Sequence, residues 1–273
     1  MTTWHELKLK GQSRLGKGDE IRNITLFIRH LQNTQIIDWH APVEAADIEA
    51  FDHFLKDRVK GRPMSHFLGH RAFWKEEFVV NRHVLDPRPD SELLVETALN
   101  LAPHAEILEL GLGSGAVLLS ILKDLPEARG TGVDISAEAL SVAGQNAQKL
   151  GVSDRVTMIE GDWCAPLEKK YDLIICNPPY LSKDEYANSA PELHWDPKVA
   201  LTDQFDGLNA YRTIAQDIAP FITLDGHLLL EIGATQTKDV SAIFKANGFA
   251  SPEILLDING KERVLRFLSP EIR

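Results

Sequence analysis

Glu109-Leu110-Gly111-Leu112-Gly113-Ser114-Gly115 lies between a short apolar run, Ile107 to Leu110, and a segment with helical periodicity, Ser114 to Asp124. This order predicts a buried strand, a tight turn and a helix. Glycines in such a turn let the backbone bend sharply and let a ligand approach the main chain, while the helix offers unpaired N–H groups. They recur at every second residue, unlike the dinucleotide pattern G-x-G-x-x-G, which favours a ligand lying across the loop over a pyrophosphate at the helix end.

Strands and helices alternate along the rest of the chain from Pro87 onward. The expected strands cover residues 107–110, 132–135, 156–159, 173–176 and 227–232. The expected helices cover a segment capped by Asp90 or Ser91 and ending at Leu101, then residues 114–124, 137–150, 208–221 and 237–247. Two further strands, 254–257 and 263–268, are separated by Asn259-Gly260. The pattern predicts an α/β fold with a Rossmann-like, doubly wound, mostly parallel sheet and C-terminal antiparallel strands.

The first part of the chain has a different pattern. Apolar residues recur at spacings of three and four between Trp4 and Leu68, which predicts a small helical N-terminal domain over residues 1–70. Phe73 to Val80 and His83 to Leu85 suggest two short strands around Asn81-Arg82, so residues 71–86 are expected to form a hairpin linker. Residues 87–273 then form the sheet-containing domain.

The net charge of −11 is unevenly distributed over the 273 residues. Residues 1–76 hold 12 lysines and arginines against 10 acidic residues, whereas residues 77–273 hold 17 against 30. The second part therefore lacks the basic surface that grips a phosphate backbone, which favours a protein or small-molecule partner over direct nucleic-acid binding. One basic cluster, Lys56, Arg58, Lys60 and Arg62, fits either an acidic partner or, more simply, a solvated helix face.

Composition also bears on compartment and metal binding. No apolar stretch reaches the roughly 18 residues of a membrane span, and residues 1–11 lack the apolar region of a secretory signal. Cys164 and Cys176 are isolated in the sequence and are interpreted as small buried side chains in a reducing compartment. These features predict a cytoplasmic protein without a membrane partner. The ten histidines show no paired-ligand spacing, so no metal site is expected.

Polar side chains follow three more of the expected strands. Asp134 ends the second strand, where a carboxylate can accept both hydroxyls of a ribose. Asp162 and Trp163 follow the third strand and offer an acceptor for an adenine amine and a flat surface, and Asn177 follows the fourth. Because the carboxyl ends of parallel strands meet at one edge of a sheet, these groups are expected to line a single ligand site.

Asn177-Pro178-Pro179-Tyr180 adds a site for a planar NH2 group. Proline fixes φ and has no N–H, so the pair holds the carbonyls of Asn177 and Pro178 in a set direction and adds no donor. A carboxamide or an exocyclic base amine can then donate its two hydrogens to Asn177 Oδ1 and the Pro178 carbonyl, with Tyr180 stacked on its face. An ordinary turn after a strand is the simpler alternative for the tetrapeptide taken alone.

Together these motifs resemble those of class I S-adenosylmethionine-dependent methyltransferases that methylate planar nitrogens. Residues 85–92, which include Pro87-Arg88-Pro89, combine with the glycine loop, Asn177 to Tyr180, Asp196-Pro197 and Asp206-Gly207-Leu208 to resemble the release-factor glutamine methyltransferases. The resemblance covers nearly all of residues 70–273. It implies S-adenosylmethionine as cofactor and the glutamine of the Gly-Gly-Gln loop of peptide chain release factors as substrate. It further implies a catalytic role for residues 87–273 and a substrate-docking role for residues 1–70.

The strand ends and the resemblance together assign the site residues. The expected cofactor-binding residues are Gly111, Leu112, Gly113, Ser114, Gly115, Asp134, Asp162, Trp163 and Asn177. The expected substrate-binding residues are Asn177, Pro178, Pro179, Tyr180 and, as the opposite apolar wall, Leu85; of these, Asn177, Pro178 and Tyr180 are the expected catalytic residues. Leu112 and Ser91 stand where the family usually has threonine, but neither departure removes a required glycine or carboxylate.

Alternatives remain for the acceptor and for two charged residues. A glutamine of a ribosomal protein, or the amine of adenine N6 or of rRNA, presents the same two hydrogens to Asn177 and Pro178. A protein that kept the cofactor fold without turnover would be expected to lose Asn177 or the glycines, and both are present. Arg88 is expected to pair with an acid such as Glu92. Glu231, at a strand end, either supports the site from behind or caps the sheet edge.

Overall fold

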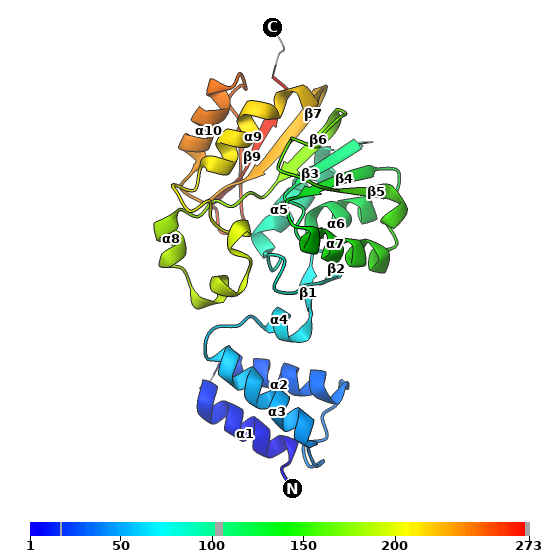
Figure 1. Ribbon diagram of the computed structural model, residues 1–273, viewed down its shortest axis with the longest axis vertical. Helices are drawn as coiled ribbons and strands as arrows, with labels where there is room; N and C mark the ends of the chain where they lie inside the picture. The colour runs from blue at the N-terminus through cyan, green and yellow to red at the C-terminus, as the bar shows by residue number, and fades with distance from the viewer. Residues whose placement is uncertain (17, 102–105, 271–273) are drawn as a thin grey trace. The chain divides into compact units, whose positions relative to one another are not determined.

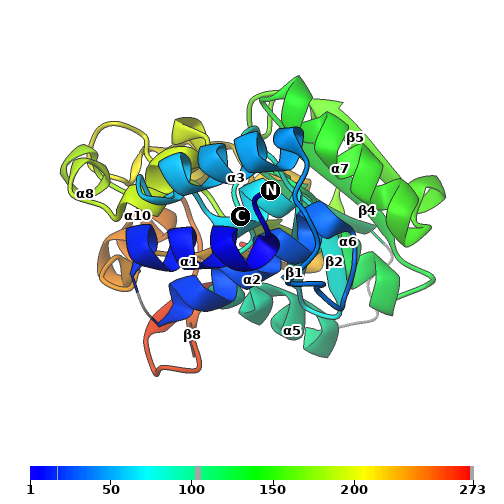
Figure 2. The ribbon, with the colours of Figure 1, turned by 90° about the horizontal axis from the view of Figure 1, so that it is seen from below.

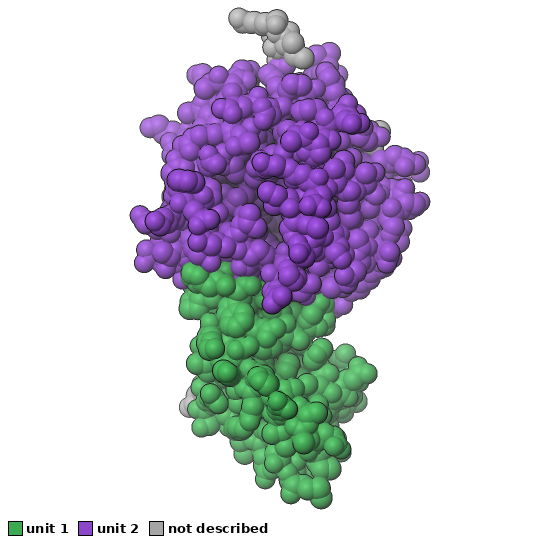
Figure 3. Space-filling view, in the orientation of Figure 1, with its two compact units in different colours: residues 1–70, 190–195 green, residues 71–189, 196–273 purple. Residues whose placement is uncertain are grey.

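The computed structural model describes residues 1–16, 18–101 and 106–270. The chain forms two compact units, shown in different colours in Figure 3. The helical unit comprises Met1–His70 and Ala190–Trp195, and the sheet unit comprises Arg71–Ser189 and Asp196–Arg273. Ala190–Trp195 follow the fourth strand of the sheet in sequence, and the sheet-containing domain expected at residues 87–273 includes them.

Four helices build most of the helical unit: α1 (Trp4–Leu15), α2 (Asp19–Gln32), α3 (Ala45–Arg58) and the short α4 (Met64–Leu68). Figure 2 shows α1, α2 and α3 lying side by side. Thr3 forms a capping box with Glu6 at the start of α1. Phe27 of α2 and Phe54 of α3 stack with ring centroids 4.3 Å apart inside the shared core. The helical periodicity of this part is therefore confirmed, and aromatic packing joins α2 to α3.

Two of the four residues of the basic cluster, Arg58 and Arg62, are paired within the helical unit. The Arg58 guanidinium lies 2.7 Å from Glu20, and the Arg62 guanidinium lies 3.3 Å from Asp57. Arg62 also lies over the Phe67 ring, 4.3 Å from its centroid. These pairs support the simpler interpretation of a helix surface over a free anion-binding patch.

The hairpin lies earlier in the chain than predicted. Its strands are β1 (His70–Phe73) and β2 (Glu76–Val79). β2 lies within the expected strand Phe73 to Val80, but His83 to Leu85 form no strand, so the turn expected at Asn81-Arg82 is wrong. The turn is at Trp74, which has φ 56°, a value uncommon for a bulky residue. Two hydrogen bonds hold it: the Trp74 backbone N–H donates to Glu92 at 2.8 Å, and its indole N–H donates to Asp124 at 3.0 Å.

The sheet unit contains the predicted seven strands in the order β5-β4-β3-β6-β7-β9-β8 (Figure 1). The strands are β3 (Glu106–Leu110), β4 (Arg129–Asp134), β5 (Val156–Glu160), β6 (Tyr171–Cys176), β7 (Ile222–Glu231), β8 (Glu253–Leu256) and β9 (Glu262–Leu268). The first five pair in parallel, whereas β9 is antiparallel to both β7 and β8. This confirms the mostly parallel, Rossmann-like sheet with C-terminal antiparallel strands.

Helices cover both faces of this sheet because the central strands are apolar on both sides. One core joins α5 (Glu92–Leu101), α6 (Ala116–Asp124) and α7 (Ala137–Leu150) to residues such as Ile107 and Ile175. The other joins α9 (Asn209–Asp217) and α10 (Thr237–Ala246) to the alternate residues, such as Leu108 and Ile174. Shorter helices are α8 (Lys183–Ala187) and 3₁₀ turns at Pro89–Ser91, Ser153–Arg155, Pro191–Trp195, Lys198–Ala200 and Ala219–Phe221.

Two other sequence features can be checked in the structure. Cys164 and Cys176 are both free and buried, as predicted. Burial raises the pKa of the Cys164 thiol to about 12, so it behaves as a small apolar side chain at neutral pH. Within the described residues, every helix is too short or too polar to traverse a lipid bilayer.

Candidate cofactor and substrate site

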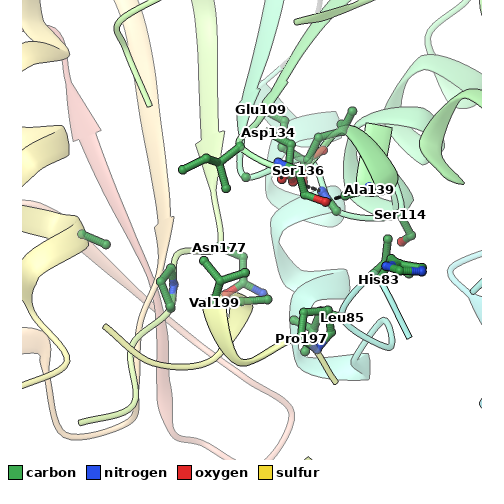
Figure 4. A pocket seen from close by; sticks show the side chains of 18 of the residues that line it. His83, Leu85, Glu109, Ser114, Asp134, Ser136, Ala139, Asn177, Pro197 and Val199 are labelled. Atoms are coloured by element: carbon green, nitrogen blue, oxygen red, sulfur yellow. Dashed lines mark hydrogen bonds between the residues drawn. The ribbon is translucent and has the colours of Figure 1, made fainter. Parts of the chain in front are cut away.

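A pocket of about 700 Å³ lies at the carboxyl ends of the parallel strands in the sheet unit (Figure 4). Its size suits a nucleoside-sized ligand. The expected site residues that line it are Leu85, Gly111, Leu112, Gly113, Ser114, Asp134, Asp162, Trp163, Asn177 and Pro179. Gly115, Pro178 and Tyr180 are not among its lining residues. In the view of Figure 4, Asp134 and Ser136 lie toward one end, Leu85 and Pro197 toward the other, and Asn177 between them.

The glycine loop connects β3 to α6 in a conformation that requires glycine. Gly111, Gly113 and Gly115 have φ values of 74°, 56° and 77°, in the left-handed region. A Cβ built on Gly113 meets no atom within 4 Å, so a side chain there would project into open space, whereas one on Gly115 would lie 2.7 Å from Leu119. Gly111 and Gly113 therefore leave room for a ligand against the backbone, and Gly115 allows α6 to begin.

Asp134, at the end of the neighbouring strand β4, holds the glycine loop by a hydrogen bond. One carboxylate oxygen accepts the Gly113 N–H at 2.8 Å and the other accepts the Ser136 N–H at 2.9 Å. Each oxygen retains lone-pair capacity for a further donor. Asp134 thus has a loop-holding role that the sequence did not reveal, in addition to the hydroxyl-binding role proposed for it.

Trp163 supports the adjoining part of the pocket. It adopts φ 45°, which is rare for a bulky residue and persists only where the surroundings hold it. A Cβ placed on Gly111 would lie 3.8 Å from the Trp163 ring, so the ring lies beside the glycine loop. Asp162 is exposed at the pocket surface. An aromatic side chain and a carboxylate therefore lie next to each other on this part of the pocket lining.

Glu109 is a buried acid on the pocket wall, and nothing in the sequence predicts a role for it. Its carboxylate accepts the Leu118 N–H at 3.0 Å, near the start of α6. Burial raises the pKa of Glu109 to about 8, and the nearby Asp134 raises it further, while the Leu118 hydrogen bond lowers it. The only sequence signal was its position, the last acidic residue before the glycines.

Asn177 connects the pocket to a buried polar pair. Its Nδ2 donates to Ser91 Oγ at 3.1 Å, and the Ser91 hydroxyl donates to Glu231 at 2.6 Å. Burial raises the pKa of Glu231 to about 7, although the hydrogen bonds and the Arg263 charge lower it. Ser91 therefore bonds to Glu231 and Asn177, rather than capping α5 as expected. Glu231 bonds inward, which favours support of the site over capping of the sheet edge.

In the rest of the Asn-Pro-Pro-Tyr loop, one residue lines the pocket and the others are directed to the protein interior. Pro179 lines the pocket, while Pro178 is buried beside it. The Tyr180 side chain packs against the core beneath α9 and α10, and its carbonyl accepts from Gln236 Nε2 at 2.9 Å. Burial raises the pKa of Tyr180 to about 12, so the hydroxyl stays protonated. The stacking role of Tyr180 remains a prediction.

Residues distant in sequence complete the wall. Pro197, Val199 and other residues between 197 and 210 line the pocket, as does His83. Arg88 pairs with the buried Asp196 at 2.5 Å, not with Glu92 as expected. In the sequence, Asp196-Pro197 is recognisable only as part of a motif, because the proximity of Asp196 to Arg88 depends on tertiary structure.

Comparison with known proteins places the chain among methyltransferases. The methyltransferase small domain family matches residues 72–193. A release factor glutamine methyltransferase of Cereibacter sphaeroides is 41% identical over 225 residues, which covers 82% of this chain and 80% of the relative. One of Agrobacterium fabrum is 36% identical over 264 residues, covering 92% and 91%. The chain also matches the bifunctional methyltransferase of Rickettsia felis at 34% identity, but it spans about half (55%) of that protein.

Among solved structures, a methyltransferase from Pyrococcus furiosus has the same fold. Its TM-score is 0.56 at 13% sequence identity, and the match covers 82% of this chain and 99% of the other. At that identity the likeness speaks for the fold alone. The curated relatives are much closer in sequence and extend over most of both chains. The chain therefore belongs to the release-factor glutamine methyltransferase family, whose methyl donor is S-adenosylmethionine.

Proposed function

We propose that the protein transfers a methyl group from S-adenosylmethionine to the side-chain amide nitrogen of the glutamine in the Gly-Gly-Gln motif of peptide chain release factors. The observation that carries this proposal is the position of Asn177, a side-chain amide at the pocket wall beside the glycine loop and Asp134. The names of the full-length relatives support release factor as the substrate class.

The pocket fits the cofactor on three structural grounds. The glycine loop leaves open space beside Gly113, the Asp134 carboxylate retains acceptor capacity, and Trp163 presents a ring beside Gly111. We infer that these residues, with Leu112, Ser114 and Asp162, hold the nucleoside and that Gly115 shapes the loop. When bound, S-adenosylmethionine supplies an electrophilic methyl group on a sulfonium centre.

Asn177 and Pro178 would make the acceptor reactive. A carboxamide nitrogen is a poor nucleophile because its lone pair is delocalised into the carbonyl. Asn177 Oδ1 and the Pro178 carbonyl accept its two N–H groups, orient the nitrogen and stabilise the positive charge that grows on it. The nitrogen gains a methyl group and then releases one proton to water, so no strong base is needed. Pro179, Leu85 and Tyr180 would confine the amide plane.

The alternative acceptors are less well supported. An adenine or rRNA amine would meet the same two acceptors, but the charge of −13 on residues 77–273 opposes a phosphate backbone. No described feature of the site favours a ribosomal-protein glutamine over release factor. The docking role of residues 1–70 and the cytoplasmic location remain part of the proposal.

The test is a comparison of acceptors. The protein is incubated with methyl-labelled S-adenosylmethionine and, separately, purified release factor, ribosomal proteins, DNA or rRNA, and the label is mapped by mass spectrometry. We expect label on the glutamine of the Gly-Gly-Gln motif and none on a release factor in which that glutamine is replaced by alanine. Label confined to nucleic acid or to ribosomal protein would refute the proposal.

A further inference from the structure

Two buried side chains form a hydrogen-bonded series with Asn177: Ser91, which also lines the pocket, and Glu231, which lies behind it. Ser91 is 4% exposed and Glu231 is 1% exposed. Asn177 Nδ2 donates to Ser91 Oγ at 3.1 Å, and the Ser91 hydroxyl in turn donates to Glu231 Oε2 at 2.6 Å. The two ends of a carboxamide have nearly the same shape but opposite hydrogen-bonding character. The group behind Asn177 therefore decides which end faces a substrate.

We propose that Ser91 and Glu231 are positioning residues that hold the Asn177 amide with its oxygen toward the substrate nitrogen. This inference rests on the proposed function, which requires Asn177 to act as an acceptor. A serine hydroxyl that donates to a carboxylate has only lone pairs left, so it can accept from Nδ2 but would repel Oδ1. The flipped amide would therefore lose its hydrogen bond and place two acceptors against each other.

Both residues are fixed by independent contacts, as a positioning role requires. The segment that carries Ser91 is anchored on either side, because Asp90 lies 3.2 Å from the Arg263 guanidinium of β9 and Glu92 accepts the Trp74 N–H at 2.8 Å. Glu231 is the last residue of β7, and its carbonyl accepts the Tyr211 hydroxyl of α9 at 2.9 Å. The Asn177 support thus rests on regular elements of the sheet unit.

The charge state of Glu231 gives this arrangement a measurable signature. A protonated carboxyl can donate to Ser91 Oγ, which frees the serine hydrogen to face Asn177 Oδ1. Burial raises the pKa of Glu231 to about 7. The charged, titratable and hydrogen-bonding groups that interact with its carboxyl group are Asp90, Arg263, Tyr180, Tyr211, Cys176, Ser91 and Asn177. As the pH falls through about 7, the orienting charge is lost, so kcat/KM should fall on the acid side.

The experiment measures single-turnover methylation of intact release factor by wild type, Ser91→Ala, Ser91→Thr and Glu231→Gln. Ser120→Ala is the matched control, because Ser120 is a serine of α6 that is only 1% exposed and does not line the pocket. We expect Ser91→Ala to lose about 10- to 100-fold in rate, as misoriented reacting groups do, while cofactor affinity and release-factor KM stay nearly unchanged. Ser91→Thr should recover most of the rate, and Glu231→Gln should remove the acid limb near pH 7.

A second measurement does not depend on which substrate is methylated. In wild type the Asn177 side-chain NH2 should exchange slowly with solvent by NMR, and Ser91→Ala should speed that exchange while Ser120→Ala should not. If wild type labels no release factor but the exchange pattern is as expected, the proposed function fails and the positioning role stands. If Ser91→Ala matches wild type in exchange, or methylates at the wild-type rate, or if Ser91→Thr recovers nothing, the positioning role is wrong.

Discussion

Replacing Glu109 by glutamine tests the energetic consequence of the acid buried in the pocket wall. Burial raises the pKa of Glu109 from 4.5 to about 8, against the hydrogen bond from Leu118 that lowers it. Between these values the folded protein binds one proton more than the unfolded chain, so stability falls as the pH rises. From pH 6 to pH 8 the loss attributable to Glu109 is about 2 kcal/mol, and by pH 9 it approaches 3 kcal/mol, because the slope of roughly 1.4 kcal/mol per pH unit levels off around the folded pKa.

The assay is urea unfolding of wild type and Glu109→Gln at pH 6 and pH 9. Glutamine keeps an oxygen for the Leu118 N–H but cannot ionise, so the variant should lose about 3 kcal/mol less stability than wild type across this range. Glu231 titrates in both proteins and cancels from the comparison. Glu106→Gln is the control, because Glu106 lies on the same strand in a partly exposed pair with Lys169. Equal losses for wild type and Glu109→Gln would refute the reasoning.

Two further predictions concern the cofactor and the substrate loop. Asp134→Ala removes the acceptor of the Gly113 N–H and should weaken S-adenosylmethionine binding by about 1 to 3 kcal/mol by calorimetry; unchanged affinity in a folded variant would remove Asp134 from the site. Gly207→Ala would place a Cβ 2.3 Å from the Tyr180 carbonyl oxygen and should slow methylation at least about tenfold. Gly151→Ala, with a similar φ and open surroundings, is its control, and equal rates for the two variants would show that the contact with Tyr180 is unimportant.

Local sequence signals were sufficient for the sheet and for the group of strand-end residues that line the pocket. β6 and the end of β7 carry apolar runs, and the ends of the parallel strands carry the glycine loop, Asp134, Trp163 and Asn177. Since all parallel strands of one sheet end at the same edge, identifying the strands also placed these residues together. Sequence alone could therefore predict which polar groups share the pocket without knowledge of the strand order.

Sequence signals failed where a residue's conformation or partner depends on distant parts of the chain. Trp74 is not a usual turn residue, and its left-handed backbone is held by Glu92 and Asp124, 18 and 50 residues away. Ser91 has the sequence context of a helix cap, but its hydroxyl donates to Glu231, 140 residues further along the chain. Such pairs leave no periodic pattern, because they form only when the sheet brings their segments together.

The most direct test of the central claim is single-turnover methylation of intact release factor by Asn177→Ala at saturating S-adenosylmethionine. The variant removes an acceptor whose value grows as the target nitrogen becomes positive, so kcat should fall on the order of 10² to 10³ while substrate affinity changes little. Asn177→Asp, which keeps an acceptor, should retain more activity than alanine, and cofactor binding measured for both variants separates binding from turnover. If Asn177→Ala methylates release factor at the wild-type rate, Asn177 is only a turn residue and the mechanism is wrong.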